Sequence, residues 1–288
     1  MNRLYECALF LAGLAFGSFL NVCISRIPQD ESIVRPRSRC PGCKAPIRWY
    51  DNIPLLSYFL LLGRCRDCGL RISARYPSVE LLTGLAFVAC YARFGVTGTT
   101  LKFCVFCFLL IGLIFMDAET GLLPREFTYT GIVLGLAFSW FVPVDAGGTS
   151  FLLYIYGKDV HNPRWLSPLD SLLGALIGAG FFYLVWALYY LVRKKHGIGF
   201  GDVALMGMAG AFLGLKLVVL VMMAAPLCGV LYVTAVLLSE TLAPSRRPDA
   251  DDRPILQREM PFGVFLGGCS LAVVFFGESV WRWYMGLF

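Results

Sequence analysis

The chain has 288 residues, of which 58% are hydrophobic and only 15% are charged, and its mean hydropathy is +0.69. Soluble domains carry roughly 25% charged residues, so this composition excludes an ordinary soluble globular protein. We therefore expect an all-α polytopic membrane protein in contact with lipid. The net charge of +6 comes mostly from loops between apolar stretches and does not indicate a nucleic-acid partner.

A membrane-spanning helix needs about 20 mainly apolar residues. By this criterion we expect about eight transmembrane helices, although 203–239 is also compatible with one long helix. The first apolar stretch is expected to be an anchor, because it lacks a clear small-residue cleavage site and precedes a basic loop. The expected spans are residues 4–24, 77–95, 100–116, 127–143, 169–192, 203–214, 217–239 and 262–286.

Positive charge predicts the orientation of these spans. Of the 25 Lys and Arg, 18 fall in the loops 25–76, 117–126, 193–202 and 240–261. Lys and Arg gather on the cytoplasmic side of membrane proteins, so these loops are expected to face the cytoplasm and both termini to lie outside. The chain then divides into a first transmembrane helix (1–24), a cytoplasmic loop (25–76) and a membrane bundle (77–288).

Glycines four residues apart recur along the apolar stretches. Small residues one helical turn apart let membrane helices approach closely. We therefore expect these glycines to pack helices together and assign them no chemistry. The pairs are Gly13/Gly17, Gly131/Gly135, Gly174/Gly178, Gly210/Gly214 and Gly263/Gly267.

Four of the 11 cysteines form two CxxC pairs in the basic loop, Cys40 with Cys43 and Cys65 with Cys68. Four thiolates in this spacing suit tetrahedral zinc, and disulfides are disfavoured in the cytoplasm. We expect a structural zinc ion that folds the loop; a redox dithiol or unliganded thiols are the alternatives. The intervening IPLLSYFLLLG is too short to span a membrane and is expected to form a helix on its surface. The other cysteines are expected to pack as small hydrophobic residues.

Two aspartates lie where apolar stretches meet the expected cytoplasmic side. Asp117 ends the third span in LLIGLIFMDAETGLLP, and Asp202 begins the sixth in GIGFGDVALMG. An acid at membrane depth is costly and indicates function, although a solvated helix-end acid and an N-cap acid are the structural alternatives. Two carboxyls that share a site do not both ionise easily, so one can activate water while the other protonates a leaving nitrogen. Gly199 and Gly201 would allow an extended substrate to approach closely.

Other acids and the histidines carry weaker signals. Glu80 lies near the start of the second span beside the cysteine loop, where a helix-start acid is the simplest interpretation. Asp170 begins the fifth span on the outer side and is also expected to be a helix-start acid. Glu119 and Glu126 follow Asp117 and are expected to be solvated. The chain has 2 histidines and no HExxH motif, which argues against a zinc protease.

The combined motifs resemble the bacterial prepilin peptidases, also called type IV leader peptidases, which are aspartyl membrane proteases with a GxGD motif. That motif is Gly199-Phe200-Gly201-Asp202, and the partner aspartate is Asp117, followed by the Leu-Pro of GLLPREFT. The stretch GSFLNVCISRIP, the two CxxC pairs, DNIPLLSY and ISARYPSVE extend the resemblance over nearly the whole chain.

The resemblance implies two activities in the bacterial inner membrane. The chain would cleave the basic leader of prepilins and pseudopilins after a glycine, and would then methylate the new N-terminus with S-adenosylmethionine. Glu80 is a candidate methyltransferase residue, and Glu119 and Glu126 are candidates for contacting leader lysines. Arg125 stands where the family usually has an acid, and Ala204 where it often has lysine; both departures bear on leader recognition.

Two other functions are compatible with parts of the sequence. A zinc metalloprotease is disfavoured because the four cysteines form a closed ligand set and the histidines lie on opposite sides of the membrane. Chelator-resistant cleavage would exclude it. A non-catalytic transporter or assembly scaffold would use the two aspartates to bind a cation, and predicts that no peptide bond is cut.

Overall fold

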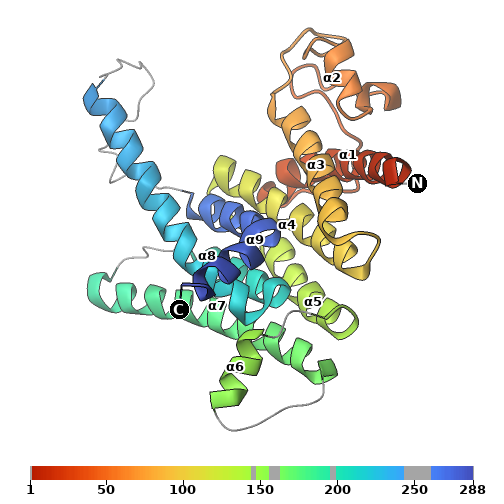
Figure 1. Cartoon of the computed structure of the whole chain (residues 1–288). Helices are drawn as coiled ribbons and strands as arrows, with labels where there is room; N and C mark the ends of the chain where they lie inside the picture. Colours follow the sequence, from red (N-terminus) through yellow and green to blue (C-terminus); the bar gives the residue numbers. More distant parts are fainter. Residues whose placement is uncertain (1, 144–146, 156–162, 195–198, 243–260, 288) are drawn as a thin grey trace.

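The computed structural model describes residues 2–143, 147–155, 163–194, 199–242 and 261–287. These residues form helices and loops, with two isolated β-bridges and no strand among them, which confirms the all-α class. Figure 1 shows most of the helices packed in one bundle, from which the C-terminal part of α8 projects, with a loop subdomain at one corner. The helices are α1 (Asn2–Arg26), η1 (Ile27–Gln29), η2 (Trp49–Asn52), α2 (Leu56–Leu60), α3 (Arg75–Phe94), α4 (Gly98–Thr120), α5 (Arg125–Phe141), α6 (Gly147–Ile155), α7 (Pro163–Arg193), α8 (Phe200–Leu242) and α9 (Phe262–Met285).

Helix α4 carries Asp117 and has a capping residue at each end. Thr97 is the N-cap, and its hydroxyl accepts a hydrogen bond from the Thr100 N–H at 3.4 Å. At the other end Gly121 adopts a φ of 65°, which favours glycine, and its N–H donates to the Asp117 carbonyl at 2.9 Å. Asp117 therefore lies one turn inside the helix end.

The small-residue pairs lie at helix contacts, as expected. A Cβ atom on Gly13 of α1 would come within 2.7 Å of the Gly84 backbone in α3. A Cβ atom on Gly174 of α7 would come within 2.6 Å of the Gly210 carbonyl in α8. Because only glycine fits at such distances, these residues let the helix backbones touch and so fix the frame of the bundle.

Helix α8 is broken at Gly214, where φ is 78° and ψ is 176°. Met206 and Val218 lie on opposite sides of this break, yet both come close to Gly178 of α7. The chain therefore folds back at Gly214, and the region contains two helical segments, as the separate spans 203–214 and 217–239 predicted.

Asp170 is not a helix-start acid, contrary to expectation. Helix α7 begins earlier, at Pro163, and Asp170 is 0% exposed. Its carboxyl accepts hydrogen bonds from the N–H and hydroxyl of Thr149 in α6, and from the Leu215 N–H just after the break in α8. The charge of Asp170 also acts on Lys102 of α4, which is buried. Asp170 of α7 is thus bonded to α6 and α8 at the end of the bundle opposite Asp117.

Several helices qualify as membrane spans. Among the described residues, 5 helices are long and apolar enough to cross a membrane: α1, α4, α7, α8 and α9. Helices α3 and α5 lie outside this set, while α8 contains two of the expected spans. The chain is therefore an integral membrane protein, and eight crossings stays a prediction. Helix α6 was not expected. It lies between the expected spans 127–143 and 169–192, in a segment that is partly outside the described residues.

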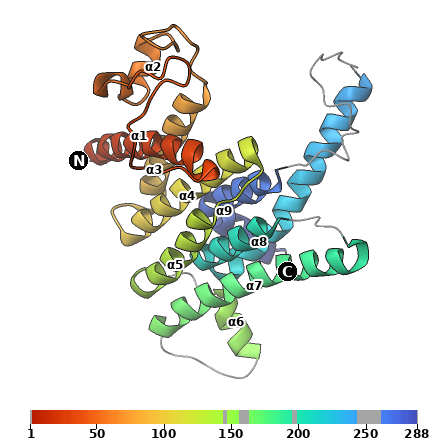
Figure 2. The ribbon, with the colours of Figure 1, turned by 180° about the vertical axis from the view of Figure 1, so that it is seen from behind.

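The basic loop forms a small subdomain at the end of α1 and the start of α3. Seen from behind in Figure 2, it lies beside these two helices and far from α6 and α7. Its helix α2 confirms that the sequence between the cysteine pairs is helical, although only 5 residues long.

Candidate active site

Asp117 lies in the last turn of α4 with 5% of its surface exposed. The Val264 N–H, in the first turn of α9, donates to its Oδ2 at 3.0 Å. The neighbouring Gly263 packs so closely that a Cβ atom there would lie 2.8 Å from the same oxygen. The N-terminus of α9, which is the positive end of the helix dipole, therefore faces the carboxyl and stabilises negative charge on it.

Asp202 lies in the first turn of α8 and is 6% exposed. Its backbone N–H donates to the Gly199 carbonyl at 3.1 Å. Its carboxyl lies against the same glycine, because a Cβ atom on Gly199 would be 3.5 Å from Oδ2. The helix begins before Asp202, at Phe200, so Asp202 is not a simple N-cap residue.

One side chain, that of Leu123, lies between the surroundings of the two aspartates. Its Cβ is 2.6 Å from the position of a Cβ on Gly201, the neighbour of Asp202. Its Cδ1 is 3.0 Å from the position of a Cβ on Gly263, which contacts Asp117. The two carboxyls are close enough for the charge of Asp117 to act on Asp202. Two acids far apart in the sequence are thus buried together at one end of the bundle.

Two buried carboxyls in this arrangement can carry out acid–base chemistry. Two buried carboxyls that interact do not both ionise readily, and their protons are shared by the pair. Such a pair can activate a water molecule and protonate a leaving group. The contribution of α9 was missed in the sequence, because Val264 is 147 residues from Asp117. The small-residue pair Gly263/Gly267 was the only signal that this helix end is closely packed.

The four cysteines of the loop come together as expected. The Sγ atoms of Cys40, Cys43, Cys65 and Cys68 all lie within 4.8 Å of one another, and none is in a disulfide. The Cys40 and Cys68 Sγ atoms are 3.7 Å apart, and thiolates about 2.3 Å from a tetrahedral zinc ion would be about 3.8 Å apart. Backbone N–H groups of Cys43 and Gly42 lower the pKa of the Cys40 thiol to about 7, which favours the metal-binding thiolate. The residues present therefore fit zinc.

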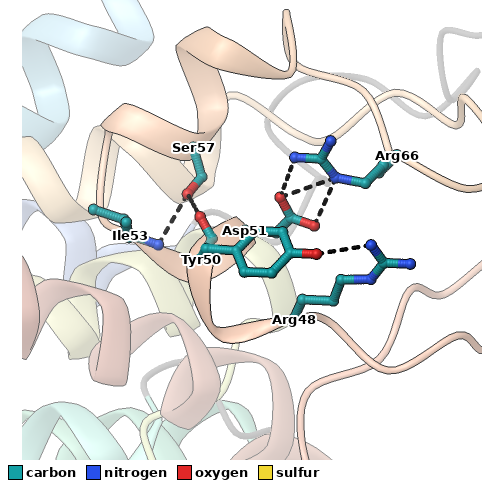
Figure 3. A network of polar contacts seen from close by, with 6 residues as sticks. All are labelled: Arg48, Tyr50, Asp51, Ile53, Ser57 and Arg66. Atoms are coloured by element: carbon teal, nitrogen blue, oxygen red, sulfur yellow. Dashed lines mark hydrogen bonds and ion pairs between the residues drawn. The ribbon is translucent and has the colours of Figure 1, made fainter.

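A polar network folds the sequence between the cysteine pairs (Figure 3). Arg66 donates to both carboxyl oxygens of Asp51, with its Nε 2.9 Å from Oδ2 and its second nitrogen 2.6 Å from Oδ1. These bonds lower the pKa of the Asp51 carboxyl. The Ser57 hydroxyl donates to the Tyr50 carbonyl and accepts from the Ile53 N–H, both at 2.9 Å. The loop thus holds its shape through side-chain contacts as well as through the cysteine cluster.

A cavity of about 560 Å³ lies between this loop and helices α1, α3 and α4. Glu80 of α3 lines it, and its buried carboxyl accepts a hydrogen bond from the Leu55 N–H at 2.8 Å. Asn21 of α1 also lines it; its Nδ2 donates to the Tyr76 carbonyl at 2.9 Å, while its buried Oδ1 has no partner in the described part of the chain. The volume suits a small-molecule site. Glu80 is therefore placed in this cavity, apart from the two aspartates.

Arg75, at the start of α3, and Glu119, at the end of α4, line the same cavity. One terminal nitrogen of Arg75 is 2.5 Å from Glu119 Oε2, and the other donates to the Ser25 hydroxyl at 2.9 Å. The guanidinium also lies 4.6 Å from the ring centre of Tyr76. Glu119, which was expected to be merely solvated, is held in an ion pair, and its side chain is 40% exposed.

Two family matches cover most of the chain. Residues 11–94 match the bacterial peptidase A24 N-terminal domain, and residues 104–234 match the type IV leader peptidase family. The first match contains the cysteine loop and Glu80. The second contains both aspartates.

The chain is also similar to proteins named prepilin leader peptidase/N-methyltransferase. It is 39% identical to one from Myxococcus xanthus, over 87% of this chain and 69% of the relative. It is 32% identical to one from Aeromonas hydrophila, over 98% and 94%, and 31% identical to one from Bacillus subtilis, over 96% of each. No solved structure matched the chain. Since such relatives align over almost its whole length, the chain belongs to the type IV leader peptidase family.

Proposed function

We propose that the chain is a membrane-embedded aspartyl endopeptidase that removes the leader peptides of prepilins and pseudopilins, with Asp117 and Asp202 as its catalytic residues. The observation that carries this proposal is the burial of both carboxyls at one end of the bundle, where the Leu123 side chain packs against the glycines beside each of them. The names of the relatives support the substrate class.

The surroundings of the two acids suggest how they divide the work. The Val264 N–H and the start of α9 suit a negatively charged Asp117, so we assign the base to Asp117 and the acid to Asp202. Asp117 takes a proton from water as the water oxygen bonds to the scissile carbonyl carbon. Asp202 gives its proton to the leaving nitrogen as the C–N bond breaks. Because Gly201 has no side chain, Leu123 fits between the surroundings of the two aspartates.

The proposal is tested with purified protein and a prepilin substrate. Asp117→Asn and Asp202→Asn are each expected to lower cleavage by about 10²-fold or more, because each removes one proton-transfer step. Zinc content and thermal unfolding should match the unmodified protein. Cleavage at a near-normal rate by either variant would refute the dyad. A scaffold or transporter predicts no cleavage by the unmodified protein, and a zinc protease predicts inhibition by chelators.

We further propose that the chain methylates the new N-terminus, in the cavity that Glu80 lines. S-adenosylmethionine, when bound, supplies the methyl group from a positively charged sulfonium. The lining of the cavity fits such a molecule: Glu80 offers negative charge, the Nε of Arg75 offers a buried donor without a partner in the described structure, and Asn21 offers an unpartnered buried acceptor. Glu80→Gln keeps the oxygen that holds the Leu55 N–H but removes the charge. It is expected to lower methylation of a cleaved peptide about tenfold or more.

The zinc ion, in this proposal, has a structural role. Four thiolates complete a tetrahedral ligand set, which leaves no open position for a reactant. Cys40 and Cys65 also line the cavity. Zinc would therefore fix one wall of the methyl-transfer site by folding the loop around it.

We also propose that the protein lies in the bacterial inner membrane with both sites facing the cytoplasm. The support is the concentration of Lys and Arg in the four basic loops. The cysteine loop is one of these basic loops, and α8 starts within another. Both the cysteine loop and the start of α8 lie at the end of the bundle that carries Asp117 and Asp202.

A further inference from the structure

The last turn of α4 separates the two proposed sites. Asp117 and Glu119 are two positions apart, which turns their side chains by about 200° around the helix axis. Asp117 faces the start of α9, whereas Glu119 faces α3 and lines the cavity below the cysteine loop. The helix ends directly afterwards, at Thr120. A chain end released at Asp117 therefore reaches the cavity by passing around one helix end.

Cleavage creates a group that the uncleaved substrate lacks. Before hydrolysis the nitrogen at the cleavage site is a neutral amide, and afterwards it is an α-amine with a usual pKa of about 7.7–8.0. At neutral pH this new N-terminus is therefore mostly a positively charged ammonium group. A carboxylate beside the peptidase site would bind the product end and ignore the uncleaved substrate.

Glu119 is a carboxylate that lines the cavity and is exposed enough to bind the new ammonium group. Arg75 contacts its Oε2, and 40% of the side chain remains exposed at the cavity. Arg75 is itself held by Ser25 and Tyr76, so the carboxylate has a fixed orientation. A second, independent feature also indicates a ligand here: the Oδ1 of Asn21, which is 2% exposed, lines the cavity without a partner in the described structure.

We propose that Glu119, oriented by Arg75, binds the α-ammonium group of the newly cleaved N-terminus and holds it in the cavity for methylation; the bound group releases a proton to water before its nitrogen, then a neutral amine, accepts the methyl group. This inference rests on the proposed methyltransferase function. It also replaces the contact between Glu119 and leader lysines that the sequence suggested. Glu126, the other acid of that suggestion, lies in the first turn of α5 and is not among the residues that line the cavity.

The test separates methylation from cleavage. The substrate for methylation is a synthetic pre-cleaved pilin peptide with a free N-terminal amine, supplied with S-adenosylmethionine, and cleavage is measured with the intact prepilin. Glu119→Gln is expected to raise the KM for methylation about tenfold or more and to affect cleavage far less. Glu126→Gln, the matched control, is expected to leave the KM for methylation unchanged. Glu119→Asp, which keeps the charge on a shorter side chain, is expected to give an intermediate KM.

The pH dependence supplies a readout that a merely structural role would not change. In the unmodified protein, KM for the pre-cleaved peptide is expected to rise above about pH 8, as the α-amine loses its charge. In Glu119→Gln this rise should be much smaller. An unchanged KM and pH profile in Glu119→Gln, or an equal loss of cleavage and methylation, would overturn the inference. Failure of the unmodified protein to methylate the peptide would instead overturn the methyltransferase proposal beneath it.

Discussion

At the scale of single residues, the proposed active site depends on the close approach of the α9 backbone to the Asp117 carboxyl. A buried acid in a membrane protein is costly unless polar groups compensate for the lost water. For Asp117 the compensation comes from the Val264 N–H. This N–H reaches the carboxyl because Gly263, directly before it, has no side chain to hold α9 away. The glycine is thus a requirement of the site, although it carries no chemical group.

Replacing that glycine tests the close approach. In Gly263→Ala the new Cβ would lie 2.8 Å from Asp117 Oδ2 and 3.0 Å from Leu123 Cδ1, so the carboxyl or α9 must shift. We expect kcat for prepilin cleavage to fall about tenfold or more, because small displacements of catalytic groups are costly. Gly268→Ala, on the same helix with nothing within 4 Å, should cleave normally. Normal kcat in Gly263→Ala would show that the contact is not needed.

At the scale of elements, the break in α8 leaves a backbone N–H group that needs a hydrogen-bond acceptor from outside the helix. Asp170 of α7 provides it by accepting the Leu215 N–H at 3.0 Å, and it binds Thr149 of α6 with its other oxygen. Lys102 of α4 is buried too, and the charge of Asp170 favours its charged form. A buried acid at a membrane helix is by default a sign of function, but these contacts explain Asp170 as the joint between α6, α7 and α8.

Asp170 variants should therefore affect stability. Removing one partner of a buried charged group typically costs about 3–5 kcal/mol, because the other charge is left unpaired. We expect Asp170→Ala to lose stability on this scale and to unfold at a clearly lower temperature in detergent. Asp170→Asn keeps an acceptor oxygen and should lose less. If the alanine variant unfolded at the normal temperature, the joint would be unimportant.

The loop subdomain is the second element whose fold can be tested. We expect Cys65→Ser to lose zinc and, because Cys65 lines the cavity, to lose methylation. Cys7→Ser, at an exposed cysteine of α1, should retain both. Thiolates bind zinc and thiols do not, so protons compete with the metal for the cysteines as the pH falls. Zinc retention should decline in the same direction. A Cys65→Ser protein with full zinc would refute the four-cysteine site.

The sequence predicted those parts of the structure that local pattern controls. The cysteine spacing, the acids at the ends of apolar stretches and the small-residue pairs all follow from short-range rules, and their positions agree with the structure. Contacts between distant segments could not be predicted. The bond from Val264 to Asp117 and the ion pair of Arg75 with Glu119 depend on how helices pack. Asp170 was misjudged for the same reason, since its partners lie on other helices.

At the scale of the whole molecule, helix directions give the bundle two distinct ends. Helix α4 runs from Lys102, which interacts with Asp170, to Asp117. Helix α9 runs the opposite way, from Gly263 beside Asp117 to Glu278, whose carboxyl is 2.9 Å from Lys216 Nζ. One end therefore carries the proposed catalytic sites, and the other carries the polar joint at the break of α8.

This polarity leads to a prediction about topology. The basic cysteine loop lies at the catalytic end, so that end is expected in the cytoplasm, and α9 should then carry the C-terminus to the outside. A reporter enzyme that is active only outside the cytoplasm should be active when fused to the C-terminus and inactive when fused after Lys194. A fusion after Phe141, at the far end of α5 (Arg125–Phe141), should be active and serves as a further control. The opposite pattern would place both sites outside, where the cysteine cluster would be exposed to oxidation, and would contradict the proposed function together with the topology.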